Sequence, residues 1–277
     1  MAAKVVSDSN FYLFQHPSSQ YLKMASYTGK NAVIIGGSHG IGLSTSQLLV
    51  DGGAKVLVTG RSLGPIEAAK QQLKEKADVV SCDITSTIAI SALVQKVESY
   101  FGTGQNIDLL FINAGYAALE PFDVVSEDSF RRTFDTNVFG AFFVAQKLSP
   151  LLRDGGSIVF TTSVANRVGI PGMATYSASK AAVQSFVQTL AAELVGRKIR
   201  VNAVSPGFVK TPTMGVAGAS NDDLREFENQ GVQTTPLGRI GEPSEVARAV
   251  IFLAFEATFT TGSEVALDGG LALLKVH

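Results

Sequence analysis

The chain has 277 residues, 45% of them hydrophobic, and a net charge of −1 at pH 7. This length suits one large domain with a substantial core. The balanced charge predicts neither a nucleic-acid partner nor a polybasic membrane patch, and no apolar run reaches the roughly 20 residues that a membrane helix needs. With one cysteine (Cys82) and three scattered histidines, we expect no disulfide framework and no bound metal ion.

Residues 1–27 carry several aromatic side chains but show no helix or strand period. They lack the apolar core of a signal peptide, and they contain no arginine, which argues against a mitochondrial transit peptide. We therefore expect a peripheral N-terminal extension over residues 1–27, a folded domain over residues 28–277 and a cytoplasmic location.

Beyond the extension, short apolar β-branched runs alternate with stretches whose apolar residues recur at helical spacing. Strands are predicted at residues 30–35, 55–59, 79–82, 107–112, 156–162, 199–204 and 264–267. Helices are predicted at residues 65–76, 87–100, 126–152, 179–195, 221–229 and 243–255, besides one that follows Gly42 and stops at Asp51. This alternation predicts one doubly wound α/β domain with seven strands, mostly or wholly parallel.

A glycine-rich turn, Gly36-Gly-Ser-His-Gly40-Ile-Gly42, lies between the first strand and the first helix. Such a turn lets backbone N–H groups approach a pyrophosphate, and the dipole of the helix N-terminus favours the negative charge. The spacing is G-x-x-x-G-x-G, which differs from G-x-G-x-x-G and from the Gly-Lys-Ser/Thr phosphate loop. An ordinary tight turn is the alternative, but the flanking strand and helix favour a dinucleotide site.

The second strand ends at Gly60-Arg61, where a dinucleotide fold faces the adenosine ribose. An acid at this point would bind the 2′-hydroxyl, whereas an arginine accommodates a 2′-phosphate. Arg61, with His39 as a second contact, therefore predicts NADP(H) over NAD(H). The alternative is that Arg61 is a solvated loop residue.

Asn137 lies inside the stretch predicted to be helical. Asparagine is a poor interior helix former. We therefore expect a local departure from regular hydrogen bonding or a polar role, with an ordinary exposed asparagine as the alternative.

Ser163, Tyr176 and Lys180 form a constellation suited to proton transfer. Ser163 follows a buried strand, while Tyr176 and Lys180 lie one helical turn apart on one face of the next helix. A phenol exchanges protons at neutral pH only if its phenolate is stabilised, and a neighbouring ammonium does this. An ordinary half-buried tyrosine and a surface lysine are the alternative for this pair taken alone.

Residues 208–237 form a long connection with one predicted helix, which is typical of lids and binding elements. The candidate substrate-lining side chains here and near Ser163 are mostly apolar or small. They are Val164, Ala165, Met173, Phe208, Met214, Val216 and Phe227. No fixed charge among them calls for an anion, which favours a neutral substrate.

From residue 28 to the end, these features resemble the motifs of the short-chain dehydrogenase/reductase family, in the family's order. The matched motifs are the glycine turn, Asp83, Asn113-Ala114-Gly115, Asn137, Ser163, Tyr176-x-x-x-Lys180, Pro206-Gly207 and Thr211. The resemblance implies a single Rossmann-like domain. Ile35 and Ile112 depart from the usual Thr and Asn, and we expect shifted packing there rather than lost activity.

The resemblance also implies roles for the matched residues. Tyr176 would be the general acid/base, Ser163 would position the substrate oxygen, and Lys180 would bind the nicotinamide ribose and lower the pKa of Tyr176. Asn137 would hold a water that links Lys180 to solvent. The cofactor-binding residues expected in total are Gly36, Ser38, His39, Gly40, Ile41, Gly42, Arg61, Asp83, Ile84, Asn113, Ala114, Gly115, Tyr176, Lys180, Pro206, Gly207, Val209 and Thr211.

The implied reaction is hydride transfer between NADP(H) and a small, neutral carbonyl or alcohol substrate. Reduction of a ketone or aldehyde is the expected direction, because the NADP pool is usually kept reduced in cells. Helices matching residues 126–152 and 179–195 pair subunits in this family, so we expect a homodimer or homotetramer.

Three alternatives stay open at this point. One is an epimerase or dehydratase on the same fold that holds its cofactor tightly. Another is a non-catalytic nucleotide-binding protein, although such relatives tend to lose the Tyr or Lys that this chain keeps. The third is an S-adenosylmethionine-dependent methyltransferase, which expects an acid where Gly60-Arg61 stands.

Overall fold

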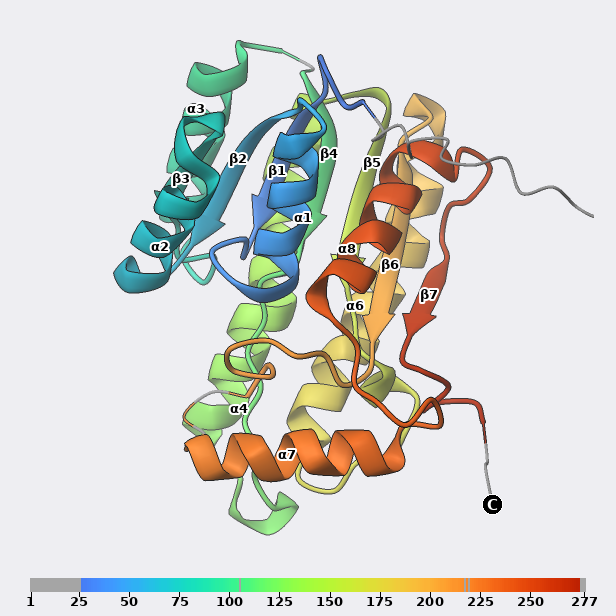
Figure 1. Cartoon of the computed structure of the whole chain (residues 1–277). Coiled ribbons are helices and arrows are strands. Elements are labelled where there is room, and N and C mark those ends of the chain that lie inside the picture. The colour runs from blue at the N-terminus through green and yellow to red at the C-terminus, as the bar shows by residue number, and fades with distance from the viewer. Residues whose placement is uncertain (1–25, 105, 217, 219, 275–277) are drawn as a thin grey trace, which may run out of the picture.

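The computed structural model describes residues 26–104, 106–216, 218 and 220–274, which form one doubly wound α/β domain (Figure 1). The strands are β1 (Asn31–Ile35), β2 (Lys55–Gly60), β3 (Ala77–Ser81), β4 (Ile107–Ile112), β5 (Leu152–Thr161), β6 (Arg200–Pro206) and β7 (Glu264–Leu267). The helices are α1 (Gly40–Asp51), α2 (Leu63–Leu73), α3 (Thr87–Phe101), α4 (Glu127–Phe134), α5 (Ala141–Leu148), α6 (Ala174–Leu194), α7 (Asn221–Thr234) and α8 (Pro243–Ile251).

The seven strands form a single sheet in the order β3-β2-β1-β4-β5-β6-β7, and every neighbouring pair is parallel. The predicted fold class is therefore confirmed. The chain order reverses between β1 and β4, and such a switch point is where ligands bind in open parallel sheets.

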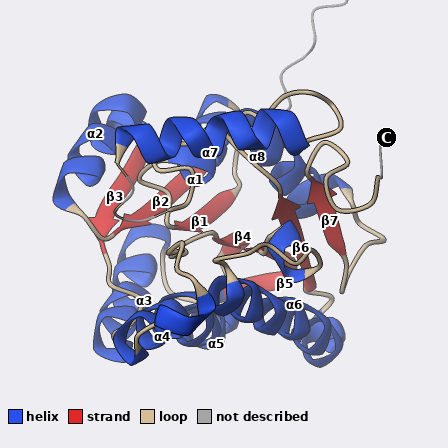
Figure 2. Cartoon of the chain, turned by 90° about the horizontal axis from the view of Figure 1, so that it is seen from below, coloured by secondary structure: helices blue, strands red, loops and turns tan. Residues whose placement is uncertain are grey.

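Helices cover both faces of the sheet, with α3, α4, α5 and α6 on one side and α1, α2 and α8 on the other (Figure 2). Each face has its own apolar cluster: Val144 and Val183 belong to the first, and Leu49 and Val246 to the second. Burial on both faces explains why the central strands are mostly apolar, as in β4, where all six residues are buried and all but Asp108 are apolar.

The predicted helix over residues 126–152 is wrong as a single element. The segment begins as α4, widens into a π-helical turn at Asp135–Gly140, continues as α5 and ends in a 3-10 turn at Ser149–Leu151. Leu152 already belongs to β5, which starts four residues earlier than predicted and carries a register shift against β4. Apolar spacing alone does not distinguish a widened turn from regular α-helix.

Other elements differ mainly at their ends. The helix that carries Tyr176 begins at Ala174 rather than residue 179, and α7 extends to Thr234. The helix predicted at 243–255 becomes π-helical at Phe252–Glu256. These are boundary errors of the kind that local patterns produce, because helix ends depend on caps and tertiary contacts.

Most of the predicted N-terminal extension, residues 1–25, lies outside the described residues. Its last residue, Tyr27, packs on the domain: the ring centroids of Tyr27 and Phe255 are 5.2 Å apart, and the Tyr27 N–H donates to the Gly52 carbonyl at 2.6 Å. In the described part of the chain, no helix has the length and apolar character needed to cross a membrane, and no cluster of metal-ligating side chains occurs.

Candidate active site

The carboxyl ends of the parallel strands meet at one edge of the sheet, which Figure 2 views directly. The glycine turn leaves β1 at this edge, Asn113-Ala114-Gly115 leaves β4, and Ser163 follows β5. Helix α7 crosses below the same edge (Figure 1). The predicted site residues therefore come from several loops that the sheet brings to one side of the molecule.

The glycine turn is packed so closely that side chains would not fit at its key positions. A Cβ on Gly36, where φ is +78°, would lie 2.6 Å from the Ala114 Cα, and one on Gly42 would lie 2.3 Å from the Gly36 carbonyl oxygen. A Cβ on Gly40 would meet the Thr211 methyl group at 3.0 Å. The turn therefore lies against the β4 loop and also brings Gly40 beside Thr211.

Side-chain hydrogen bonds fix this edge from neighbouring strands. Asn113 Nδ2 donates to the Gly36 carbonyl at 2.8 Å, and its Oδ1 accepts from Thr161 Oγ1 at 3.0 Å. The Thr59 hydroxyl accepts from the Gly36 N–H at 3.3 Å. The sequence reasoning missed both threonines, and the only local signal is that each stands near the carboxyl end of a predicted strand.

The residues assigned to the adenosine end also lie together. Buried Ser38 packs against Gly60, where a Cβ would lie 2.7 Å from the serine side chain. The Asp83 carboxylate accepts from the Thr85 N–H at 3.0 Å and hydroxyl at 2.8 Å. The Thr85 hydrogen bonds lower the pKa of Asp83, and the nearby Arg61 guanidinium lowers it further. Arg61 is exposed and therefore free to meet an anion.

Three further predicted contacts flank this end of the site. His39 is exposed at the residue before α1, and Ile41 follows it in the first turn of the helix. Ile84 is buried against Gly140, where a Cβ would lie 2.7 Å from its side chain. The loop after β3 is therefore held against the π-helical turn.

The side chain of Lys180 is buried at the site. It is 3% exposed, and its ammonium donates to the Thr161 carbonyl at 2.8 Å, 5.6 Å from the centre of the Tyr176 ring. A Cβ on Gly115 would lie 3.4 Å from the ammonium, so the β4 loop also adjoins it. Desolvation lowers the pKa of Lys180 to about 8, which brings its proton exchange close to neutral pH.

Tyr176 and Ser163 face each other across the site. Burial raises the pKa of Tyr176, and hydrogen bonding with the Ser163 side chain partly offsets the increase. On balance the pKa of Tyr176 is therefore raised in this structure, whereas the sequence predicted a lowered value. Lys180 directs its ammonium to a strand carbonyl, and the buried phenol loses more hydration than its neighbours restore.

Asn137 departs from regular helix geometry, as its position predicted. It lies in the π-helical turn with 1% exposure, so the alternative of an exposed asparagine is wrong. Its Oδ1 accepts from the Tyr116 N–H at 2.7 Å, and its Nδ2 donates to the Tyr116 carbonyl at 2.8 Å and to Ser179 Oγ at 2.9 Å. The side chain thus ties the β4 loop to the helix that carries Tyr176 and Lys180. The sequence reasoning missed Ser179, which is buried on that helix.

The loop after β6 completes the edge. Pro206 ends the strand, and Gly207 lies so close to the end of β7 that a Cβ would be 3.0 Å from Asp268 Cα. Val209 is buried and pairs with Gly241 as an isolated bridge. This pairing directs the chain toward Thr211, the residue beside Gly40.

The predicted substrate-lining residues are largely covered in this structure. Val164, Ala165, Met173 and Val216 are buried, and the rings of Phe208 and Phe227 lie 4.9 Å apart. The Phe208–Phe227 contact fastens α7 to the loop after β6. Met214 has a φ of +44°, a strained value for this residue type.

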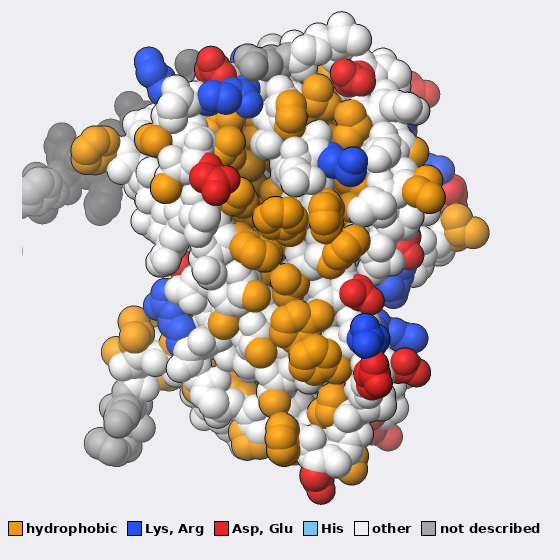
Figure 3. Space-filling model, turned by 180° about the vertical axis from the view of Figure 1, so that it is seen from behind, with side chains coloured by type: hydrophobic (Ala, Val, Ile, Leu, Met, Phe, Trp, Pro, Cys, Tyr) orange, Lys and Arg blue, Asp and Glu red, His pale blue; other side chains and the backbone are white. Residues whose placement is uncertain are grey.

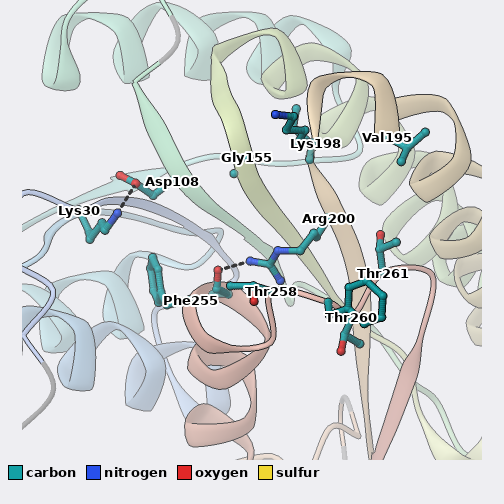
Figure 4. Close-up of a pocket in the computed structure, with 14 residues that line it drawn as sticks. Lys30, Asp108, Gly155, Val195, Lys198, Arg200, Phe255, Thr258, Thr260 and Thr261 are labelled. Carbon is teal, nitrogen blue, oxygen red and sulfur yellow. Dashed lines mark hydrogen bonds and ion pairs between the residues drawn. The ribbon is translucent and has the colours of Figure 1, made fainter.

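Two cavities of the structure do not coincide with the full set of predicted residues. One, of about 720 Å³, lies at the opposite edge of the sheet, between Lys30, Asp108, Arg200 and Phe255 (Figure 4). The other, of about 550 Å³, adjoins the loop between Ser163 and Tyr176 and is lined by Phe122, Ala165 and Arg167. Of these two cavities, the second lies beside the segment that joins Ser163 to Tyr176.

Comparison with known proteins agrees with this geometry. The family model described as "Enoyl-(Acyl carrier protein) reductase" matches residues 36–272. An uncharacterised oxidoreductase of Methylorubrum extorquens is 37% identical over 90% of this chain and 100% of that protein. The L-fucose dehydrogenase of Mus musculus is 35% identical over 89% of this chain and 90% of its own length.

Two further similarities cover nearly the whole domain. The 3-oxoacyl-[acyl-carrier-protein] reductase of Thermotoga maritima is 35% identical over 88% of this chain and 98% of that protein. A solved structure described as a short chain dehydrogenase/reductase family protein superposes with a TM-score of 0.78 at 34% identity, covering 89% of this chain and 99% of that one.

The fold, and the convergence of its loops at the carboxyl edge of the sheet, are typical of α/β domains that bind a dinucleotide. With the family model and these relatives, the chain belongs to the short-chain dehydrogenase/reductase family, whose members use NAD or NADP.

Proposed function

We propose that this protein is an NADP(H)-dependent reductase of a small, neutral ketone or aldehyde, which also oxidises the corresponding alcohol. The observation that supports this most strongly is a buried lysine one helical turn from a tyrosine whose phenol faces Ser163. A buried ammonium is costly unless it has work to do there or is well paired. Its place at the carboxyl edge of the sheet favours a catalytic role.

The residues present fit a dinucleotide. The close packing at Gly36 and Gly42 leaves backbone N–H groups at the start of α1 without covering side chains, which is the arrangement that a pyrophosphate needs. When bound, the nicotinamide supplies or accepts the hydride. In the proposed site, Asp83 and Ile84 would meet the adenine, and Asn113, Ala114 and Gly115 would lie along the cofactor. The carboxamide would be fixed by Val209 and Thr211, next to Pro206 and Gly207.

The proposed proton chemistry uses three side chains. The Ser163 hydroxyl holds the substrate oxygen, and the Tyr176 phenol gives that oxygen a proton during reduction. Lys180 stabilises the phenolate that forms, because its charge adjoins a site with little water. Asn137, with its side chain bonded to the Tyr116 backbone, keeps the β4 loop beside Lys180, where a water can return the proton.

The apolar residues near Ser163 support a neutral substrate. The test is a panel of ketones, aldehydes and alcohols, followed at the nicotinamide absorbance band with NADPH, NADH and the oxidised forms. Turnover of a neutral carbonyl is the expected result. Absence of binding of either nucleotide by the purified protein would remove the proposal.

Arg61 is the residue proposed to select NADP(H). Exchange of Arg61 for Asp is expected to lower the NADPH-over-NADH ratio of kcat/KM by about tenfold or more, because a hydrogen bond to a charged group contributes about 1.5–3 kcal/mol. Steady-state kinetics with both cofactors measures the ratio. Exchange of Lys198 for Asp, an exposed cation at the opposite edge, is the matched control and should leave it unchanged. An unchanged ratio in the Arg61 variant would disprove the assignment.

We also propose that two copies pair through the face of α4, α5 and α6. A hydrophobic band runs along this face (Figure 3), where Phe130 is 46% and Phe139 36% exposed. Contiguous exposed apolar surface of this kind marks interaction sites. Exchange of Phe130 for Asp is expected to reduce the oligomer mass measured by light scattering. Leu63 lies on α2, on the other face of the domain, and is 74% exposed; its exchange for Asp should leave the oligomer mass unchanged. A monomeric wild-type protein would contradict the proposal.

A further inference from the structure

Glu264, the first residue of β7, places a carboxylate inside the domain close to the candidate active site. Its side chain is 3% exposed. None of the motifs that define the site contains this residue. A buried carboxylate is costly unless it is paired and hydrogen-bonded, so its partners indicate what it holds in place.

The partners of Glu264 lie on both sides of Ser163. Its Oε1 accepts from the Thr162 hydroxyl and from Asn166 Nδ2, the latter at 2.8 Å. Its Oε2 forms an ion pair with Arg167 NH2 at 2.6 Å. One strand residue therefore binds the position directly before Ser163 and the third and fourth positions after it.

Asn166 extends this network to the helix that carries Tyr176 and Lys180. The second N–H of its side-chain amide donates to Gln184 Oε1 at 3.1 Å. Gln184 lies one helical turn after Lys180 on α6. The backbone N–H of Asn166 donates to the Ser163 carbonyl at 3.0 Å. Asn166 thus connects three parts of the fold: its side-chain amide binds Glu264 of β7 and Gln184 of α6, and its backbone N–H binds Ser163.

The two sides of the loop depend on Glu264 to different degrees. Thr162 is also held by Val204, whose carbonyl accepts from the Thr162 backbone N–H at 2.9 Å. Arg167 has no other ion-pair partner among the described residues. Loss of Glu264 would therefore leave Thr162 in place and weaken the hold on Asn166 and Arg167, in the same short turn where the Ser163 hydroxyl accepts from the Ala165 N–H at 3.2 Å.

We propose that Glu264 is a positioning residue that holds the Ser163 hydroxyl against Tyr176 by fixing the segment after Ser163. This inference rests on the proposed function, because it assumes that Ser163 and Tyr176 act together. A displacement of about 1 Å at such a group can lower the rate about 10²-fold, so the expected effect is on kcat.

Exchange of Glu264 for Ala is expected to lower kcat by about tenfold or more while the dissociation constant for NADPH stays within about twofold. Exchange for Gln keeps an acceptor for Thr162 and Asn166 and should restore most of the lost rate. A crystal structure of the Ala variant should show the Ser163 hydroxyl moved away from Tyr176. If that variant does not fold, exchange of Asn166 for Leu tests the same connection and leaves the carboxylate paired with Arg167.

The matched control is exchange of Asp108 for Asn. Asp108 is likewise a buried carboxylate, 5% exposed, with ion pairs to Lys30 and Arg153, but it lies at the opposite edge of the sheet. The exchange of Asp108 for Asn should lower the melting temperature of the protein without lowering kcat. A crystal structure with Ser163 in its original place, or an unchanged kcat in the Ala variant, would overturn the inference. Failure of the wild-type protein to turn over any substrate would instead remove the proposed function, and the crystal structure still tests the positioning.

Discussion

Exchange of Tyr176 for Phe is expected to lower kcat by about 10²-fold or more, the usual contribution of a positioned acid or base. Phenylalanine keeps the ring and its packing but removes the hydroxyl that we propose exchanges a proton with a substrate oxygen held by Ser163. Cofactor affinity should change little, because the glycine turn and the loops after β3 and β6 are untouched. Single-turnover kinetics with a substrate from the panel, together with NADPH binding by fluorescence, separates the two effects.

Tyr100 provides the matched control for this exchange. It is a half-buried tyrosine on α3, where its ring lies under the Lys55 ammonium at 4.2 Å. Exchange of Tyr100 for Phe removes a hydroxyl from a tyrosine outside the candidate site, so kcat should stay close to the wild-type value. Near wild-type turnover by the Tyr176 variant would exclude the phenol from the mechanism and leave the buried Lys180 without its proposed function.

The parts of the fold that the sequence predicted are those determined by local periodicity. Seven apolar runs predicted seven strands, because a parallel sheet covered on both faces needs strands that are apolar throughout. The failure at residues 126–152 has a physical reason. The π-helical turn is maintained by Asn137, whose partner Tyr116 lies 21 residues earlier in the chain. An asparagine inside a helical pattern signals a departure but does not identify the partner.

The pKa values and hydrogen-bond partners at the site were harder to predict from the sequence than the identities of the candidate residues. Tyr176 and Lys180 were identified by spacing, but the pKa of each depends on how much surrounding chain excludes water, and local sequence does not contain that quantity. Glu264 shows the same limit more sharply. Its partners Thr162 and Asn166 are 102 and 98 residues away, and in the sequence it is simply the first residue of a short predicted strand.

The second prediction with a large expected effect concerns Lys180 and the pH dependence of the free energy of unfolding. Desolvation lowers its folded-state pKa from 10.5 to about 8. Between these two pH values the unfolded chain holds a proton that the native protein has released, so the free energy of unfolding rises with pH across this range. A shift of this size corresponds to about 3 kcal/mol, at about 1.4 kcal/mol for each pH unit.

Exchange of Lys180 for Met removes this titration while nearly preserving the length of the side chain. The difference in unfolding free energy between the wild-type protein and the variant should therefore increase in favour of the wild type from pH 8 to pH 10.5. Urea denaturation without added nucleotide, repeated across that range, measures it. Exchange of Lys198 for Met, an exposed lysine at the opposite edge, should give a flat difference.

A flat difference for Lys180 would mean that its ammonium is hydrated in the folded protein. The proposed mechanism could not then rely on an unscreened charge beside Tyr176, because water would weaken the interaction between the ammonium and a phenolate. A rising difference together with a large loss of kcat would show that the same burial which costs stability at neutral pH supports the proton transfer. The lysine would then be retained for catalysis at the expense of the fold.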